Sequence, residues 1–310
     1  GDGVMTRVST FGNYESALAN LMFAQTRANE AQQRVSSQRI ATDLTGFGRQ
    51  SETLTALKAT QSRIQGFMDA AGAAGERLSA QDLALNRVAD GTGGARQAIA
   101  DALAAGRLDG LMLEVEGQFQ MVQGGLNAKH QGRYLFAGGN VETAPVDVMT
   151  LADLAAVPAV ADVFSNDTLK QKSRIDEGTV LETGVLADEV GTDIFQIFKD
   201  IQTYHQTTPL NGTISDATRD FLTGILKRLD TGRETVTDTA ARNGSMQNRV
   251  DAIIAGQTNQ KAALDQVLAG KTDADMAQAI TDLQLSQVAI QAAAQVVNQL
   301  RSVSLLNFLT

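Results

Sequence analysis

The C-terminal stretch, residues 272–310, carries apolar residues at helical spacing and almost no charge. From Met276 to the end, the charged side chains are Asp282 and Arg301. Apolar or small residues recur three or four positions apart in two stripes. The first stripe comprises Ile280, Leu283, Ile290, Ala294 and Val297, and the second comprises Leu285, Val288, Ala292, Val296, Leu300 and Val303. A helix with two apolar faces needs more than one partner helix. The pattern predicts a terminal helix that packs against other helices, either within a monomer core or between copies of the chain.

The N-terminal stretch has the same character. Between Val8 and Gln33 the charged residues are Glu15, Arg27 and Glu30. The three-four spacing is kept by Phe11, Tyr14, Leu18, Leu21, Gln25, Ala28, Gln32 and Val35. This predicts a helix over about 11–39, broken by the two glycines within residues 42–48. Because each terminal helix lacks another apolar partner of similar length, we expect the two to pair.

Two longer helical patterns lie inside the terminal ones. The first runs from Leu54 to Leu85 with apolar residues at heptad spacing, and the Gly-rich residues 91–94 are expected to interrupt or kink it. Shorter helices are predicted over about 95–106, 108–130 and 193–205. The longest pattern runs from Leu222 to Val267 without a change of register and is expected to end at Gly270. Thr272 or Asp273 is the expected N-cap of the terminal helix.

The middle of the chain has a different pattern. Residues 133–139 predict a short strand that ends in a turn. Residues 140–190 show no helical period and contain Pro145 and Pro158. Residues 172–175 and 179–186 flank Asp-Glu-Gly, a three-residue loop typical of a β-hairpin. We therefore expect a small β-containing insertion here.

These elements predict a mainly α protein. The expected fold is an elongated antiparallel bundle of long helices, with the N- and C-terminal helices paired and a small β-containing insertion domain. Five segments follow from this arrangement: an N-terminal assembly helix (1–42), the first half of the bundle (43–139), the insertion (140–190), the second half of the bundle (191–271) and a C-terminal assembly helix (272–310).

Composition narrows the range of functions. The formal net charge of −9 argues against nucleic-acid binding, and the absence of cysteine excludes thiolate chemistry. His130 and His205 are the two histidines, and neither has a metal-ligand spacing. No apolar run approaches the roughly 18 residues of a membrane span. We expect no catalytic residue, no cofactor, no metal site and no membrane insertion.

Several short segments, taken in order, resemble the flagellin superfamily, and within it the hook–filament junction proteins (hook-associated protein 3). They are residues 7–10 (Arg-Val-Ser-Thr), 36–40 (Ser-Ser-Gln-Arg-Ile), 134–138 (Tyr-Leu-Phe-Ala-Gly), 245–250 (Ser-Met-Gln-Asn-Arg-Val), 273–277 (Asp-Ala-Asp-Met-Ala) and 304–309 (Ser-Leu-Leu-Asn-Phe-Leu). The order of these segments is more specific than any one of them. The family usually follows its Arg-Ile segment with an Asp-Asp-Pro turn, and here residues 42–46 lack the proline.

The resemblance implies a structural, non-enzymatic protein of the extracellular bacterial flagellum. It would be secreted through the flagellar type III export apparatus, with an export chaperone as an additional candidate partner. Copies would form a ring that joins a hook-side hook-associated protein to flagellin through the terminal helices. The expected assembly interface comprises Phe11, Leu18, Leu21, Val35, Ile280, Leu283, Ile290, Val297, Leu300, Leu305 and Leu306. The alternatives are a minor or minimal flagellin of the filament itself and a soluble helical module that binds client proteins with its apolar ends.

Overall fold

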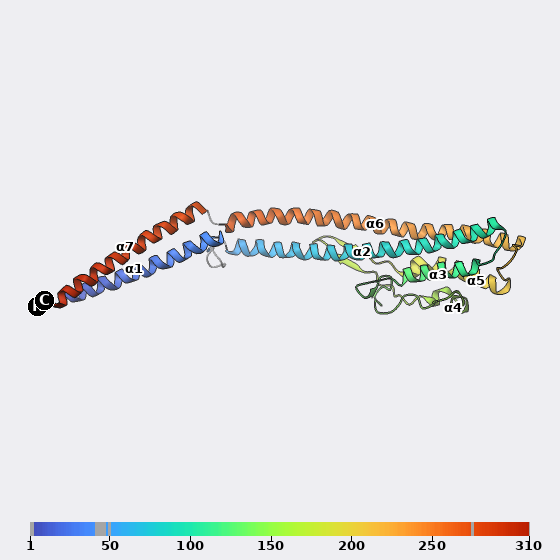
Figure 1. The fold of residues 1–310 in the computed structure, drawn as a ribbon, viewed down its shortest axis with the longest axis horizontal. Coiled ribbons are helices and arrows are strands. Elements are labelled where there is room, and N and C mark those ends of the chain that lie inside the picture. Colours follow the sequence, from blue (N-terminus) through green and yellow to red (C-terminus); the bar gives the residue numbers. More distant parts are fainter. Residues whose placement is uncertain (1–2, 41–47, 49–50, 274–275, 310) are drawn as a thin grey trace. The chain divides into compact units, whose positions relative to one another are not determined.

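A computed structural model describes residues 3–40, 48, 51–273 and 276–309, with side chains described within 12–40, 48, 51–273 and 276–302. Seven α-helices and two small antiparallel sheets of two strands each make up this part of the chain (Figure 1). The predicted mainly α class is confirmed. The chain divides into two compact units. One comprises residues 1–62 and 260–310, and the other comprises residues 63–259.

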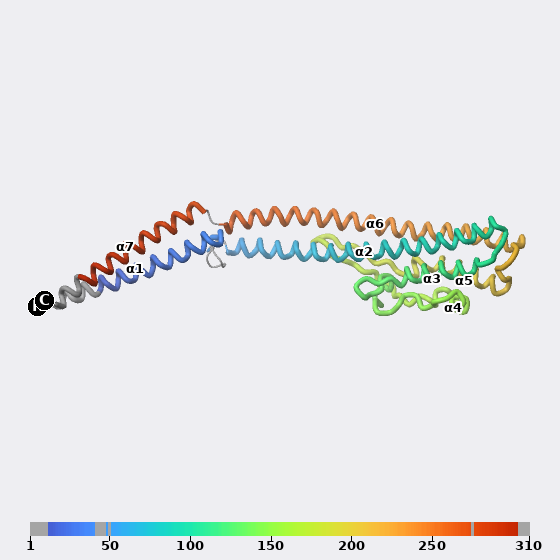
Figure 2. Tube along the Cα trace, in the orientation of Figure 1, coloured from blue at the N-terminus to red at the C-terminus, as the bar shows by residue number. Residues whose placement is uncertain are grey.

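In the first unit, helices α1 (Gly3–Ser37) and α7 (Met276–Leu309) lie side by side and antiparallel (Figure 2). The backbone N–H of Ile40, just after α1, donates to Thr272 O at 2.6 Å. Arg39 and Asp273 form an isolated antiparallel bridge at the same place. These contacts hold the end of α1 against the chain that leads into α7, so the predicted pairing of the terminal helices is confirmed.

The two long helices are α2 (Ser51–Ala105) and α6 (Asp216–Thr272). Most of the apolar positions predicted to line their seam are buried, among them Leu54, Ile64, Leu78, Leu85, Leu222, Ile225, Leu229, Val236 and Val250. The last predicted seam position, Val267, differs from the prediction. It is 48% exposed, whereas the next residue, Leu268, is only 8% exposed. A helix with 3.6 residues per turn drifts away from a strict seven-residue repeat, which is why the buried face moves by one position.

The end of α6 also differs from the prediction. The helix continues through Gly270 and Lys271 to Thr272, whose Oγ1 donates to Leu268 O at 2.7 Å. Thr272 is therefore the last residue of α6, and Asp273, whose N–H donates to Ala269 O at 2.7 Å, continues its hydrogen bonding. Neither residue is the N-cap of α7, which begins at Met276. The predicted break over residues 42–48 lies outside the described residues except for Gly48.

Helix α2 continues through the glycine cluster at residues 91–94, so the predicted interruption does not occur. Gly91 and Gly94 face α3 (Leu111–Leu126), whereas Gly93 faces Arg233 of α6. A Cβ atom at Gly91 would lie 2.8 Å from Val122 Cγ2 and 3.0 Å from Gln118 O. From the other side, a Cβ atom at Gly125 would lie 2.7 Å from Val88 Cγ2. The glycines thus allow two helix backbones to approach closely, and the packing outweighs their low helix propensity.

Helix α3 and helix α5 (Ala187–Thr207) form the core of the second unit with α2 and α6. Phe119 of α3 packs edge-on against Phe195 and Phe198 of α5, with ring centroids 5.3 and 5.5 Å apart. Both helices differ in length from the prediction. α3 ends at Leu126 because the Asn127 side chain exchanges two 3.0 Å hydrogen bonds with the backbone of Val146. α5 begins six residues earlier than expected.

The insertion contains the predicted hairpin and a helix that was not predicted. Strands β1 (Lys129–His130) and β2 (Arg133–Tyr134) form a tight hairpin just before it. Strands β3 (Lys172–Arg174) and β4 (Val180–Glu182) then pair antiparallel around the Asp-Glu-Gly loop. Between the two hairpins lie α4 (Leu151–Ala156) and the 3₁₀ helix η2 (Val160–Val163). Helix α4 begins with a capping box formed by Thr150 and Asp153. The capping box can be read in the sequence, but no helix was predicted there because the segment shows no long helical period.

Candidate assembly interface

The face on which α1 and α7 meet is built from small side chains. Ala17, Ala24, Ala28 and Ala31 of α1 are buried, as are Ala279 and Ser286 of α7. Small residues let two helices approach closely, but each contributes little apolar area. The pairing of the two helices therefore uses little of the large apolar surface that they carry.

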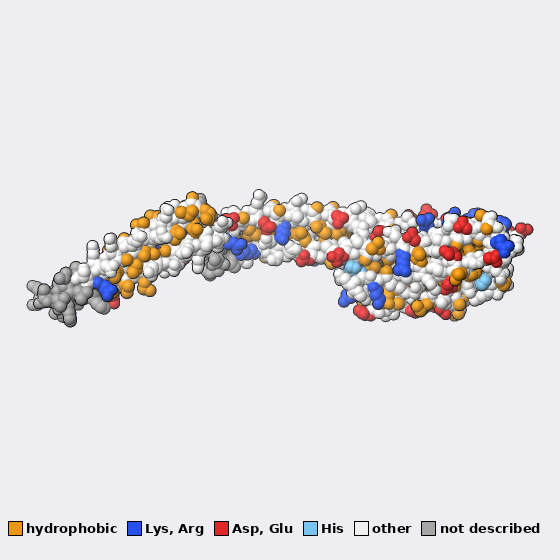
Figure 3. All heavy atoms as spheres, viewed as in Figure 1, with side chains coloured by type: hydrophobic (Ala, Val, Ile, Leu, Met, Phe, Trp, Pro, Cys, Tyr) orange, Lys and Arg blue, Asp and Glu red, His pale blue; other side chains and the backbone are white. Residues whose placement is uncertain are grey.

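The large apolar side chains of both helices are exposed to solvent instead. Their exposed fractions are 41% for Leu18, 62% for Met22, 70% for Phe23, 44% for Ile280, 64% for Leu285, 62% for Val288 and 46% for Val296. We call these seven residues the exposed apolar stripe. Hydrophobic side chains can be followed along this helix pair in the space-filling view (Figure 3). Monomeric proteins rarely expose a long apolar surface of this kind, and such a surface usually marks an interface with a partner.

Charge is sparse along the same helices. Arg34 of α1 and Asp282 of α7 form an ion pair with an N–O distance of 3.5 Å, and the two side chains are 32% and 35% exposed. A half-exposed pair contributes little to stability, on the order of 1 kcal/mol or less. It favours one register of the two helices, because a shift by one turn would separate the two charges.

The predicted interface residues fall into three groups. Leu18 and Ile280 belong to the exposed apolar stripe. Six others are half-buried on the paired helices: Leu21, Val35, Leu283, Ile290, Val297 and Leu300. The side chains of Phe11, Leu305 and Leu306 lie outside the described residues. The residues of the first two groups therefore lie on one helix pair, but the side chains of the first group are more exposed than those of the second.

Met22 and Phe23 were not predicted as interface residues, although they are among the most exposed apolar side chains of α1. Met22 lies four positions after Leu18, so helical spacing alone could have indicated it. Leu285, Val288 and Val296 were recognised as a second stripe but were not assigned to the interface. Their exposure shows that α1 does not cover these three members of the second stripe.

Other possible chemistry is limited in the described part of the chain. It contains no group of three or more acidic or histidine side chains that could hold a metal ion. Among the same residues, no helix is long and apolar enough to cross a membrane. His205 Nδ1 accepts a 2.9 Å hydrogen bond from the backbone N–H of Leu210, which ties down the loop after α5. His130 lies in strand β1 rather than at a helix end.

Comparison with protein families gives a match at the C-terminal end of the chain. Residues 226–309 match the model of the bacterial flagellin C-terminal helical region. This part of the chain is flagellin-like. The match includes most of α6, from residue 226 onward, and all of α7, and so contains the α7 part of the exposed apolar stripe. The resemblance to the flagellin superfamily that the short sequence segments indicated is therefore confirmed.

Solved structures with similar folds cover a larger part of the chain. A protein from Vibrio parahaemolyticus described as a flagellar hook-associated protein is 15% identical, with a TM-score of 0.60 over 72% of this chain and 97% of that one. FlgL from Bacillus cereus is also 15% identical, with a TM-score of 0.56 over 69% of this chain and 99% of that one. At this identity the likeness establishes a shared fold. No curated protein sequence matches the chain. The shared fold and the flagellin region together support a structural role in the flagellum.

Proposed function

We propose that the protein is an extracellular structural subunit of the bacterial flagellum, located at the junction of hook and filament. The observation that carries the proposal is the exposed apolar stripe on the helix pair α1 and α7. A flagellin C-terminal region includes the α7 part of that stripe, and the solved proteins of similar fold include a hook-associated protein. Residues 1–42 and 272–310 are the assembly segments, and residues 140–190 are the insertion.

In this proposal, two faces of the helix pair have different roles in assembly. Small side chains hold α1 and α7 together, which leaves the large ones for neighbouring copies. Burying a valine or leucine side chain stabilises an interface by about 1.5–3 kcal/mol at most. Seven such side chains per copy could therefore supply much of the association energy, after the cost of ordering each subunit. The half-buried residues Leu21, Val35, Leu283, Ile290, Val297 and Leu300 complete the proposed interface, with Phe11, Leu305 and Leu306 beyond them.

The partners follow from the position in the flagellum. Other copies of this chain complete a ring, a hook-side hook-associated protein contacts one end of it, and flagellin contacts the other. Delivery to this site requires the flagellar type III export apparatus, and an export chaperone would cover the exposed apolar stripe before secretion. A minor or minimal flagellin would use the same helix pair in the same way, so position in the flagellum is what distinguishes the two functions.

The first experiment replaces one residue of the exposed apolar stripe. Val288→Asp should leave thermal unfolding unchanged, because Val288 is 62% exposed in the isolated chain. In the assembly the aspartate would be forced into a dry interface at a cost of a few kcal/mol per copy. We expect loss of self-association in vitro and loss of filament attachment in the source bacterium. Leu83→Asp is the matched control, because Leu83 is 74% exposed on α2, away from the stripe. Normal swimming of the Val288→Asp strain would refute the proposed interface.

The second experiment tests the position in the flagellum by electron microscopy of a strain that lacks the protein. Bare hooks together with secreted, unattached flagellin would support a junction protein. Filaments that remain attached but are shortened or altered would identify a flagellin of the filament instead. Intact flagella with unchanged motility would contradict both functions and favour a client-binding module.

A further inference from the structure

The sequence contains two Asn-Gly pairs, and the fold gives them different surroundings. They are Asn211-Gly212, in the loop between α5 and α6, and Asn243-Gly244, within α6. An Asn-Gly pair is prone to spontaneous deamidation, because glycine has no side chain to hinder the approach of its backbone nitrogen to the side-chain amide of the asparagine. Whether the reaction takes place in the folded protein depends on the exposure of each pair and on the freedom of its backbone.

The first pair lies in an exposed loop. The Asn211 side chain is exposed and makes no hydrogen bond with the described part of the chain. Gly212 has a φ of 67°, in the left-handed region that favours glycine. Loops open locally at a lower free energy than helices within a packed bundle. Solvent therefore reaches the Asn211 amide, and a local movement of the loop is enough to bring the Gly212 nitrogen towards it.

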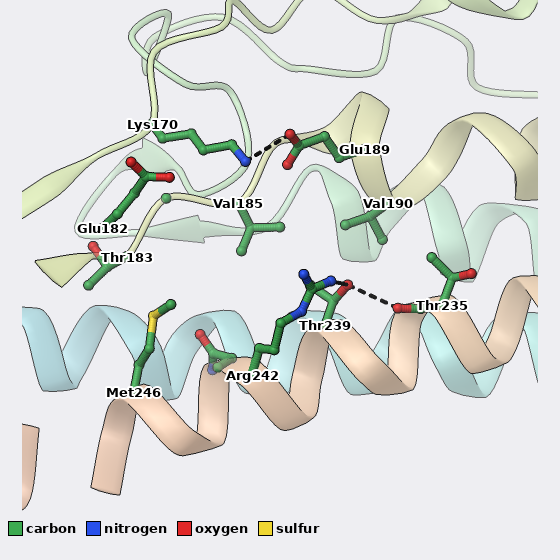
Figure 4. A pocket seen from close by; sticks show the side chains of 12 residues that line it. Lys170, Glu182, Thr183, Val185, Glu189, Val190, Thr235, Thr239, Arg242 and Met246 are labelled. Carbon is green, nitrogen blue, oxygen red and sulfur yellow. Dashed lines mark hydrogen bonds and ion pairs between the residues drawn. The ribbon is translucent and has the colours of Figure 1, made fainter. Parts of the chain in front are cut away.

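The second pair is enclosed by the bundle. Asn243 is 3% exposed, and its Nδ2 donates to Leu78 O of α2 at 2.7 Å. A cleft of about 320 Å³ beside Arg242 adjoins this part of α6, and Figure 4 shows the side chains that line it. The cleft does not expose the amide, because Asn243 Oδ1 is buried as well. The α-helical backbone also directs the N–H of Gly244 along the helix axis, so its nitrogen cannot turn towards the Asn243 side chain.

Hydrogen bonds hold Gly212 against the loop that joins α2 and α3. Its N–H donates to Asp109 Oδ1 at 3.1 Å, and its carbonyl accepts from the N–H of Leu108 at 2.8 Å. Arg107 donates from Nε and Nη2 to Asp109 Oδ2 at 2.9 and 2.6 Å. The hydrogen bond from Arg107, followed by that from Gly212, lowers the pKa of Asp109. A carboxylate with a lowered pKa is a weak base, so it holds the Gly212 N–H without removing its proton.

We propose that Asn211 is a site of spontaneous deamidation and that the contact between Asp109 and Gly212 limits its rate. When this contact opens, the Gly212 nitrogen gives up its proton and attacks Asn211 Cγ, and the side-chain nitrogen leaves with a proton as ammonia. Water then opens the cyclic imide at either carbonyl carbon, which gives aspartate or isoaspartate. The proposal is independent of the function proposed for α1 and α7, because it uses no residue of those helices.

The reaction would change the loop irreversibly. Either product adds a negative charge to the residue before Gly212, whose N–H binds the carboxylate of Asp109. Isoaspartate also adds one carbon atom to the backbone at this point. Like charges repel and the longer backbone displaces Gly212, so both changes oppose re-formation of the hydrogen bonds to Asp109 and Leu108. The loops between α2 and α3 and between α5 and α6 would then lose a contact that joins them.

The test incubates the purified full-length protein at mildly alkaline pH and follows its peptides by mass spectrometry. Deamidation raises the mass of a peptide by about 1 Da. We expect this increase in the peptide that contains Asn211, and at least about tenfold less of it, over the same time, in the peptide that contains Asn243. Protein unfolded in urea should deamidate at both pairs at similar rates, because only the fold protects Asn243. Asn211→Gln should remove the increase from the loop peptide.

Asp109→Ala tests the contact that limits the rate. Alanine is used because Asp109 precedes Gly110, so asparagine would create a third Asn-Gly pair. Deamidation of Asn211 should become several-fold faster in this variant. Asp69→Ala, which removes another exposed carboxylate of α2 or its adjoining loop, should leave the rate unchanged.

Three results would overturn the proposal. Slower deamidation in Asp109→Ala would mean that the carboxylate removes the proton of the Gly212 N–H and does not restrain it. Equal rates at Asn211 and Asn243 in the folded protein would show that the fold does not select between the two pairs. An unmodified Asn211 in the folded protein, under conditions in which the unfolded protein reacts, would show that the loop does not open enough for the attack.

Discussion

At the scale of single residues, glycines within helices have opposite effects that depend on what surrounds them. Gly91 lies against Val122 and Gln118 of α3, where there is no room for a methyl group. Gly66, on the same helix α2, has nothing within 4 Å of the position that a Cβ atom would occupy. In the first case the packing of two helices requires glycine. In the second, glycine only adds conformational freedom to the unfolded chain.

The same substitution should therefore change stability in opposite directions at these two positions. Gly91→Ala should destabilise the protein by about 1–3 kcal/mol, because the added methyl group forces α2 and α3 apart. Gly66→Ala should stabilise it by about 0.5–1 kcal/mol, because alanine favours the helix and fits in open space. Urea unfolding of the two variants and the parent measures both effects. A stabilising Gly91→Ala would mean that α3 does not pack closely on α2.

At the scale of elements, the loop after strand β2 is held by one carboxylate of the insertion. Asp167 Oδ1 accepts hydrogen bonds from the backbone N–H groups of Gly139 at 2.7 Å and Leu169 at 2.9 Å. Gly138 adopts a φ of 67° beside the same carboxylate. The carboxylate thus joins the end of the segment that resembles the junction-protein motif, residues 134–138, to a later part of the insertion.

These hydrogen bonds favour the charged carboxylate, and the bond from Gly139 followed by that from Leu169 lowers the pKa of Asp167 below its ordinary value of 3.8. A carboxylate whose pKa is lower in the folded state contributes stability that is present above its unfolded pKa, near 3.9, and is lost as pH falls through the folded value. The melting temperature of the parent should therefore fall between about pH 5 and pH 2 more than that of Asp167→Asn. Parallel pH profiles of the two proteins would contradict a role for this carboxylate.

At the scale of the whole molecule, the two compact units are stabilised by different kinds of packing. The unit of residues 63–259 has a large core in which Phe119, Phe195 and Phe198 are fully buried. The helix pair α1 and α7 is joined mainly through alanines and keeps its large apolar side chains exposed. Since buried apolar area dominates folding stability, the first should be much more resistant to unfolding than the second.

Hydrogen exchange of the dilute full-length protein tests this difference. Amides of α3 and α5 should exchange only on global unfolding. Those of residues 12–40 and 276–302 should open with a free energy lower by about 2 kcal/mol or more, because their helices share little buried area. Equal protection of both regions would show that the terminal helices belong to the same cooperative core as α3 and α5. That result would argue against the proposal that their exposed apolar surface is buried by other subunits.

Helical periodicity and low charge were sufficient to predict the mainly α class, the pairing of the terminal helices and the hairpin formed by β3 and β4. These features depend on the spacing of apolar and turn residues along the sequence, which can be read without a structure. Periodicity could not decide which apolar face of α7 meets α1, because both stripes have the same spacing. Only the structure shows that the alanine face is paired and that Leu285 and Val288 remain exposed.

The remaining differences have the same physical origin. The prediction placed these features by residue propensity, but each of them contacts a segment distant in the sequence. Gly91 packs against α3, Thr272 O at the end of α6 accepts from the N–H of Ile40, and the N–H of Ala187 at the start of α5 donates to Phe136 O. The cleft beside Arg242 joins residues 170–190 to residues 235–246, a combination that no local pattern contains. Sequence by itself therefore determined which segments are helical and which faces are apolar. The tertiary structure decided which of these faces are buried, because burial depends on the segments that long-range packing brings together.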